Sequence, residues 1–142
     1  MKMESPDYTL LDHTADLGIR VSGTDISHLF ENACSTLIEL LLDIKYSSST
    51  TLTQVVINGD DLEDLMVRWL GEILYLFEGE NTIVISCKIT NISKKHLEAE
   101  LETISFDPLI HEVVREIKAV TYHDIQVDRK NDSWEASIIF DL

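Results

Sequence analysis

The residues best suited to chemistry lie in one short segment near the start of the sequence, Asp12-His13-Thr14-Ala15-Asp16. The segment separates two short runs of strand-forming residues, and loops held between strands are common places for functional side chains. A sharp turn there can aim both carboxylates inward and leave them short of positive partners. Carboxylate oxygens without cysteine ligands select a hard ion, so the segment is a candidate site for a divalent cation, Ca²⁺ before Mg²⁺ or Mn²⁺.

Two more acidic groups stand at the other end of the sequence, the side chain of Asp141 and the terminal carboxylate of Leu142. If the final strand lies beside the first, these groups would join Asp12 and Asp16 as metal ligands. The plainer interpretation is that the loop carboxylates bond loop amides and that Asp141 is simply solvated, and the residue pattern alone favours it. His13 is a candidate contact to a partner or a nucleotide, although a histidine inside a short turn more often supports its own loop.

Lys118 is the cation that we single out. It falls within a predicted strand from Ile117 to Val127, on one face with Val120 and Tyr122. A cation among so many acids can pair with one of them structurally, or it can hold a phosphate. From the residues alone, structural pairing is the plainer interpretation.

The charge balance limits the class of partner. The 11 Lys and Arg residues against 26 Asp and Glu residues leave a formal net charge of −15. Such a chain repels phosphate backbones, so tight unaided nucleic-acid binding is not expected, and a basic protein or a cation is a better partner. Solubility alone is an equally simple reason for the charge.

Cys34 and Cys87 are the only cysteines. Neither has a second cysteine or a histidine at zinc-ligand spacing, and both lie in apolar segments, which predicts buried reduced thiols in a cytosolic protein. The first residues have no apolar targeting segment, and no later run approaches the length of a membrane span. The sequence also contains no Gly-rich phosphate loop and no Gly-x-Ser-x-Gly elbow, so it does not match these enzyme signatures.

Two helices are predicted from apolar residues at three- and four-residue steps. The first runs from Asp25 to Asp43 with Thr24 as its cap, and its apolar stripe should face a sheet. The second runs from Asp61 to about Glu78, with Asp60 as its candidate cap. Its apolar face is wide enough for the helix to be covered on two sides.

Strands are predicted where the period changes to two. Two long helices among about seven mostly antiparallel strands give an α+β fold, with the helices packed on a sheet face, in a single domain spanning residues 1–142. The predicted strands are 8–12, 18–22, 50–57, 83–89, 97–101, 117–127 and 134–140, the last two forming a hairpin through residues 128–133.

Five blocks along the chain resemble the archease family, in family order and from residue 8 to the last residue. The first block is the acidic segment with its flanks, and the second is Phe30-Glu31-Asn32-Ala33 on the first helix. The other three are Asp61 to Leu65 with Trp69 to Leu76, Lys118-Ala119-Val120-Thr121-Tyr122-His123, and Ile139-Phe140-Asp141-Leu142.

The resemblance implies an accessory protein and no reaction of its own. Archeases are cofactors of the RtcB-type RNA-splicing ligase, which attaches GMP to its own histidine and joins 2′,3′-cyclic phosphate or 3′-phosphate ends to 5′-hydroxyl ends in tRNA splicing. The archease speeds guanylylation, allows repeated turnover and broadens nucleotide use. The family's fold is similar to a strand-helix-strand-strand module with an inserted or duplicated half. Its metal site matches Asp12, Asp16 and Asp141 here, and its functionally important lysine matches Lys118.

The sequence departs from the family between residues 103 and 111. Phe106-Asp107-Pro108 and His111 fit, but Thr103-Ile104 and Ile110 replace a Gly-Glu pair and a basic residue.

Two rival functions stay open. One is a metal-dependent phosphoester hydrolase that uses Asp12 and Asp16, and the other is a nonspecific acidic chaperone.

Overall fold

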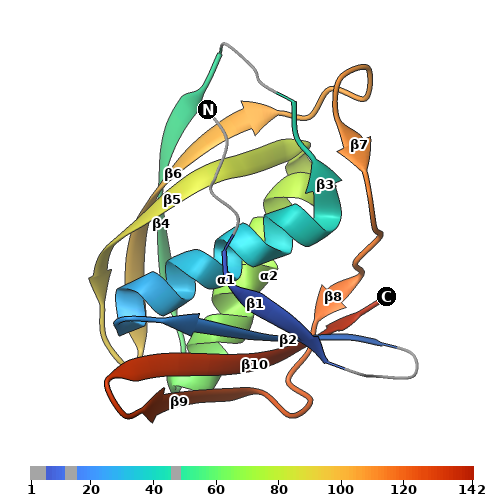
Figure 1. Cartoon of the computed structure of the whole chain (residues 1–142). Coiled ribbons are helices and arrows are strands. Elements are labelled where there is room, and N and C mark those ends of the chain that lie inside the picture. The colour runs from blue at the N-terminus through green and yellow to red at the C-terminus, as the bar shows by residue number, and fades with distance from the viewer. Residues whose placement is uncertain (1–5, 12–15, 46–48) are drawn as a thin grey trace.

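The computed structural model describes residues 6–11, 16–45 and 49–142. Within these residues the chain forms two long helices and several β-strands (Figure 1). The helices are α1 (Ile26–Leu41) and α2 (Leu62–Glu80). The strands are β1 (Tyr8–Leu11), β2 (Asp16–Gly23), β3 (Leu42–Asp43), β4 (Thr51–Asn58), β5 (Thr82–Ile92), β6 (His96–Ser105), β7 (Glu112–Val113), β8 (Ala119–Val120), β9 (Gln126–Lys130) and β10 (Ser133–Asp141).

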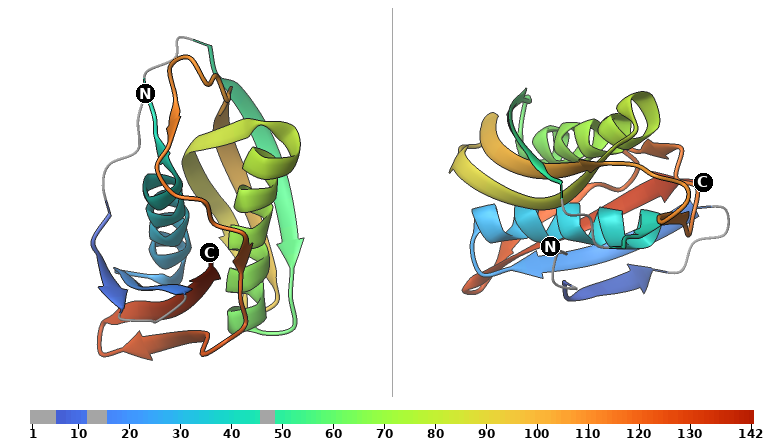
Figure 2. Two further views of the ribbon diagram at one scale, coloured as in Figure 1. Left: turned by 90° about the vertical axis from the view of Figure 1, so that its right-hand side faces the viewer. Right: turned by 90° about the horizontal axis from the view of Figure 1, so that it is seen from above.

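The strands make two larger antiparallel sheets and one small one. The first sheet has the order β1-β2-β10-β8, with β9 also paired to β10, and the second has the order β4-β6-β5. Strands β3 and β7 form the small sheet. Helix α1 lies between the larger sheets and packs on β2 and β5, while α2 packs on β5, β4 and β8 (Figure 2). The predicted α+β class, mostly antiparallel with two long helices packed on sheets, is confirmed.

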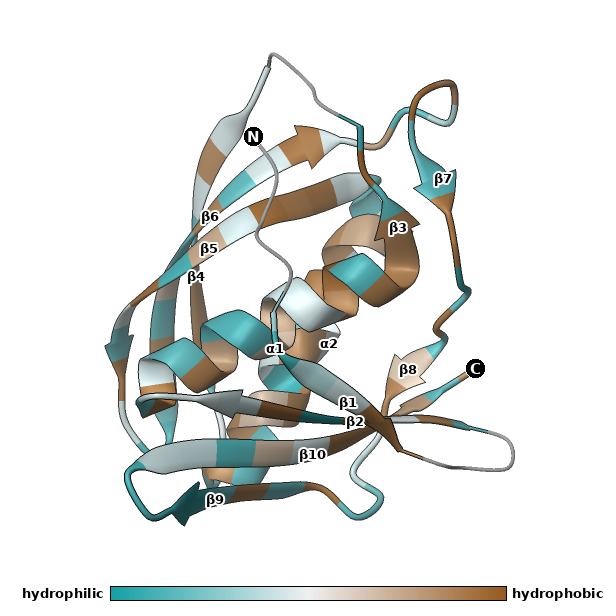
Figure 3. Ribbon diagram, in the orientation of Figure 1, coloured by the Kyte–Doolittle hydropathy of each residue, from teal (hydrophilic) through white to brown (hydrophobic). Residues whose placement is uncertain are grey.

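Helix α1 buries one apolar side against both larger sheets and leaves a hydrophilic side outside (Figure 3). Its cap is Asp25, whose carboxylate accepts a hydrogen bond of 2.8 Å from the His28 amide. The prediction of Thr24 as cap is wrong by one residue, because the Thr24 hydroxyl instead contacts the His28 ring at 3.1 Å. The helix ends at Leu41, since Leu42 and Asp43 become strand β3.

Helix α2 begins at its cap Asp61, whose carboxylate accepts from the Asp64 amide at 2.8 Å, so the prediction of Asp60 as cap is also wrong by one residue. The helix ends at Glu80, and its C-cap Asn81 adopts a left-handed conformation with φ of 52°, a common helix stop. Both sides of the helix are covered, as predicted, because the residues that widen its apolar face are buried too. These are Val67, Leu70 and Leu74.

The predicted strand from 117 to 127 is wrong, because the chain turns in its middle. Only β8 and the start of β9 pair with β10, and between them lies a turn closed by the Ile125 amide and the Tyr122 carbonyl. Asp124 has a φ of 51°, a left-handed conformation that ends strand pairing. The chain then enters β9, which forms the predicted hairpin with β10.

No helix in the described part of the chain is both long enough and apolar enough to cross a membrane.

Candidate functional site

The two ends of the chain meet in the first sheet. Strand β10 lies between β2 and β8, and Asp141 is directly opposite Asp16 on one side and Ala119 on the other. Directly opposed residues of antiparallel strands share a face, with their Cβ atoms about 5 Å apart. Asp16, predicted in a loop, is the first residue of β2 and is half-buried, while Asp141 is exposed. Two predicted site carboxylates are therefore brought together.

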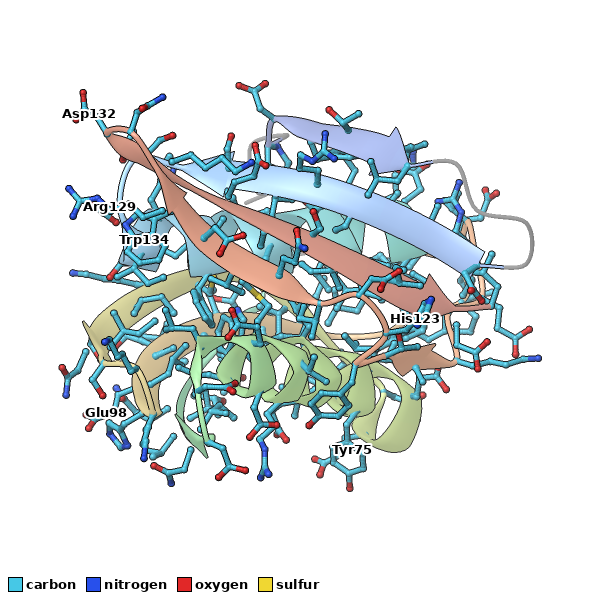
Figure 4. All side chains as sticks on the ribbon, turned by 90° about the horizontal axis from the view of Figure 1, so that it is seen from below. Tyr75, Glu98, His123, Arg129, Asp132 and Trp134 are labelled. Carbon is cyan, nitrogen blue, oxygen red and sulfur yellow. The ribbon has the colours of Figure 1, made fainter. Side chains whose placement is uncertain are left out.

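The structure also places the backbone of Lys118 beside Asp141. Its backbone N–H donates to the Asp141 carbonyl at 2.7 Å, which fixes the start of β8 on the sheet. Its side chain is exposed and lines a shallow groove of about 370 Å³ over α2, next to Tyr75 and Gly71. Figure 4 shows Tyr75 projecting outward from α2. In the described residues no ion pair joins Lys118 to a carboxylate.

Asp12 and His13 lie outside the described residues. Leu142 directly follows β10 and its residue surface is 41% exposed. Across residues 6–11, 16–45 and 49–142, no three acidic, histidine or cysteine side chains gather closely enough to hold a metal ion. Asp16 and Asp141 offer oxygen ligands of the type that Ca²⁺ and Mg²⁺ prefer, and a complete ligand set would need Asp12 or the terminal carboxylate as well.

A second polar cluster, centred on Asp64 in the first turn of α2, was not predicted. Its carboxylate accepts hydrogen bonds from the Tyr122 hydroxyl at 2.6 Å, from Arg68 Nε at 2.9 Å and from the Asp60 amide at 2.8 Å. Nearby, Glu63 accepts from the Val127 amide at 3.2 Å. These contacts tie the segment that follows Lys118 to α2. From the sequence, an acidic residue in the first turn of a helix indicates only a role at the helix end. The contact of Asp64 with Tyr122 was not predictable, because the two residues are far apart along the chain.

The cluster around Asp64 makes the stability of the fold depend on pH in the acid range. The Tyr122 hydroxyl first, then the Asp60 amide and Arg68, lower the pKa of Asp64 from 3.8 to about 2. The ionised carboxylate is thus favoured by folding, so its stabilisation is complete above about pH 4 and is lost as the pH falls through about 2.

This pH dependence can be tested with Asp64→Asn. Between those two pH values the free energy of unfolding in urea should fall less steeply with decreasing pH for Asp64→Asn than for the parent, because the variant has no carboxylate to protonate. Asp132→Asn, which removes an exposed carboxylate, is the control, and parallel curves for Asp64→Asn and the parent would refute the assignment.

The segment from 103 to 111 is packed into the fold at both of its ends, while residues 108–110 are exposed. Thr103 and Ile104 are buried strand residues of β6. The carbonyl of Asp107 accepts from the amides of Ile110 and His111, while the buried His111 ring accepts the Asp107 amide through Nδ1 at 3.0 Å. Phe106 packs edge-on against Phe77, with 5.3 Å between ring centres. These contacts give Phe106, Asp107 and His111 a structural role in this loop.

Cys34 and Cys87 are free thiols, and Cys34 is fully buried as predicted, whereas Cys87 is only half-buried. A hydrogen bond with Cys87, and then burial, raises the pKa of Cys34 well above its usual value. A thiol held in its protonated form is a poor nucleophile, so Cys34 is a structural residue, as predicted.

The fold and the acid pair define the class: a small acidic α+β protein whose polar residues meet at an exposed end of a sheet. The model of the archease protein family matches residues 8–142. The chain belongs to the archease family. It is 32% identical to the protein archease of Methanosarcina barkeri over 148 residues, covering 100% of both chains. It is also 32% identical to that of Pyrococcus furiosus, covering 92% of this chain and 95% of the relative.

Two solved structures share the fold. The solution structure of protein 1598 from Methanobacterium thermoautotrophicum has a TM-score of 0.71 at 23% identity, covering 95% of this chain and 98% of that one. The crystal structure of an archease from Thermotoga maritima, described as a possible chaperone, has a TM-score of 0.64 at 21% identity, covering 100% and 99%. At these identities the likeness shows the fold, and the predicted archease-like fold is confirmed.

Proposed function

We propose that the protein is a non-catalytic activator of an RtcB-type RNA-splicing ligase, and that it works in the cytosol through the strand end formed by Asp16, Asp141 and Lys118. The observation that carries the proposal is the direct opposition of Asp16 and Asp141 across β2 and β10. Two like charges facing each other across a sheet cost stability. A cation or a basic partner bound by these two carboxylates would offset that cost.

A divalent ion is part of the proposal. Asp16 and Asp141 would hold it together with Asp12 and the carboxylate of Leu142, and the oxygen donors suit Ca²⁺, with Mg²⁺ or Mn²⁺ as alternatives. Such an ion would offset the repulsion between the carboxylates and present a positive charge at the docking surface. Lys118 would contact a phosphate of the bound nucleotide or a carboxylate of the ligase.

Long-range attraction brings the two proteins together. The net charge of −15 favours encounter with a basic surface, such as one that binds RNA and GTP. Complementary charge raises association rates by roughly tenfold to a thousandfold, and salt weakens the effect. Once docked, the strand-end residues stabilise the guanylylation-competent state of the ligase by contacts made only in that state.

The test is transfer of labelled GMP to the ligase, measured with and without the protein. We expect a faster initial rate with the protein present, and a stimulation that falls steadily as NaCl rises from about 50 mM to about 500 mM. If the rate of GMP transfer with the protein equals the rate without it at every salt concentration, the proposal is rejected. Phosphoester cleavage by the protein alone would point to the hydrolase, and equal stimulation by an unrelated acidic protein to the nonspecific chaperone.

A further inference from the structure

Strand β4 is an open edge of the second sheet. The sheet order is β4-β6-β5, and in the described part of the chain nothing pairs with the outer side of β4. Six of its eight residues are exposed, and Figure 2 shows the strand at the margin of the molecule. An edge strand presents a row of unpaired amide and carbonyl groups that can accept another strand.

The sequence of β4, Thr-Leu-Thr-Gln-Val-Val-Ile-Asn, lacks the usual protection of such edges. Proteins protect edge strands with charged residues, proline, bulges or short length. This strand has no charge, although 26% of the whole sequence is charged, and it contains no proline. Its pairing with β6 runs without interruption from Thr51 to Asn58, whereas the register shifts in this sheet occur between β5 and β6.

The residues of β4 are also complementary to themselves. If two copies run antiparallel with Gln54 opposite Gln54, then Leu52 faces Val56 of the second copy on the outer face. On the other face Thr53 meets Val55. Leu52 and Val56 are 65% and 58% exposed, so this register covers the two most exposed apolar side chains of the strand in matched pairs. Apolar and β-branched cross-strand pairs each stabilise a sheet by about 0.2–1 kcal/mol.

We propose that β4 pairs antiparallel with β4 of a second copy of this chain, in the register centred on Gln54, and joins the two three-stranded sheets into one continuous sheet. The contact is small, so the dimer is weak and reversible. This inference concerns a surface separate from the strand end of Asp16 and Asp141, and it goes beyond the proposed function.

The uncharged, apolar residues of β4 favour a second copy over a basic strand from another protein, and the nearby carboxylates do not prevent this pairing. The row of carboxylates nearest to β4 lies on β6, where Glu98, Glu100 and Glu102 stand opposite Val56, Gln54 and Leu52. A basic strand paired with β4 would place its positive charges against the apolar side chains of Leu52 and Val56. Strand β4 itself would then separate those charges from the carboxylates of β6. In the dimer the two glutamate rows are three strand spacings apart, about 14 Å, which exceeds the screening length of about 8 Å at physiological salt.

The register is tested with single cysteines in the full-length protein. Under mild copper-phenanthroline oxidation, Gln54→Cys should form a disulfide-linked dimer, because directly opposed Cα atoms are about 4.5–5.5 Å apart and within disulfide reach. Thr53→Cys, on the neighbouring residue, should stay monomeric, since residue 53 faces residue 55. The parent, with its own two cysteines, is the background control. Equal cross-linking of the two variants, or none by Gln54→Cys, would overturn the register.

Association itself is measured by sedimentation velocity. We expect the average mass to rise above 16.2 kDa with concentration, and to rise further when NaCl is increased, because salt screens the repulsion between two acidic chains. Leu52→Lys with Val56→Lys puts like charges opposite each other and should lower the association constant at least about tenfold. Leu109→Lys with Val114→Lys, at exposed positions outside β4, is the matched control. A monomer at every concentration and salt, or the same loss in the control, would reject the dimer.

Discussion

The double variant Asp16→Asn with Asp141→Asn is expected to lose about 99% of the stimulation of ligase guanylylation. If each carboxylate makes one charge-assisted contact worth about 1.5 kcal/mol or more, removing two costs about 3 kcal/mol, or roughly a hundredfold in affinity for the ligase. The measurement is the initial rate of GMP transfer at concentrations of the protein below saturation.

The same variant should remain folded, because asparagine keeps the shape of aspartate and the two residues oppose each other at a solvent-facing strand end. Removing the repulsion should leave stability unchanged or raise it by less than about 1 kcal/mol. The matched control is Asp128→Asn with Asp132→Asn, which changes the net charge equally near the β9–β10 turn. Figure 4 shows Asp132 at the end of the sheet away from His123. Equal losses in the two variants would mean that overall charge, and not this strand end, drives activation.

The largest loss of stability is expected from Trp69→Ala. Trp69 is completely buried on α2, and its indole N–H donates to the Phe30 carbonyl on α1 at 2.9 Å. The substitution removes a large apolar side chain and leaves that carbonyl without its indole donor. We expect the free energy of unfolding to fall by about 3–5 kcal/mol and Tm by roughly 10–20 °C.

Trp69→Phe separates the two causes, because it retains much of the ring volume and removes only the hydrogen bond and part of the bulk. Its loss should be clearly smaller than that of Trp69→Ala. Trp134→Ala, at a half-buried position on β10, is the comparison for a less buried indole. Urea unfolding followed by circular dichroism gives all three values. Equal losses for Trp69→Ala and Trp134→Ala would contradict the central place of Trp69 in the core.

Much of the fold was predictable because it depends on neighbours along the chain. The three- and four-residue steps of apolar residues placed both helices, with errors of one or two residues at their ends, since a cap depends on which side chain reaches back to the helix amides. The predicted strand from 117 to 127 failed for a different reason. Alternation continues through Tyr122 in the sequence, but its hydroxyl bonds to Asp64, and the chain turns there.

The candidate site was predicted in part. The residue types at Asp16, Lys118 and Asp141 were recognisable, as were Asp12 and His13, which lie outside the described residues. Their importance came from the resemblance to archeases, because short acidic segments are common in loops and strand ends. The contacts of Asp64 with Tyr122 and Arg68 had no signal in the sequence beyond an acidic first helical turn.

The sequence by itself determined the local features of this protein: the helical and strand periods, the net charge of −15 and the presence of acids at both ends. The tertiary structure alone decided that Asp16 and Asp141 face each other. The register of β2 and β10 places Phe140 opposite Leu17 against the core, so the next residues must share the opposite face. Side chains alternate along a strand, and a shift of one residue would bury the acids and expose the apolar pair, so core packing fixes the pairing.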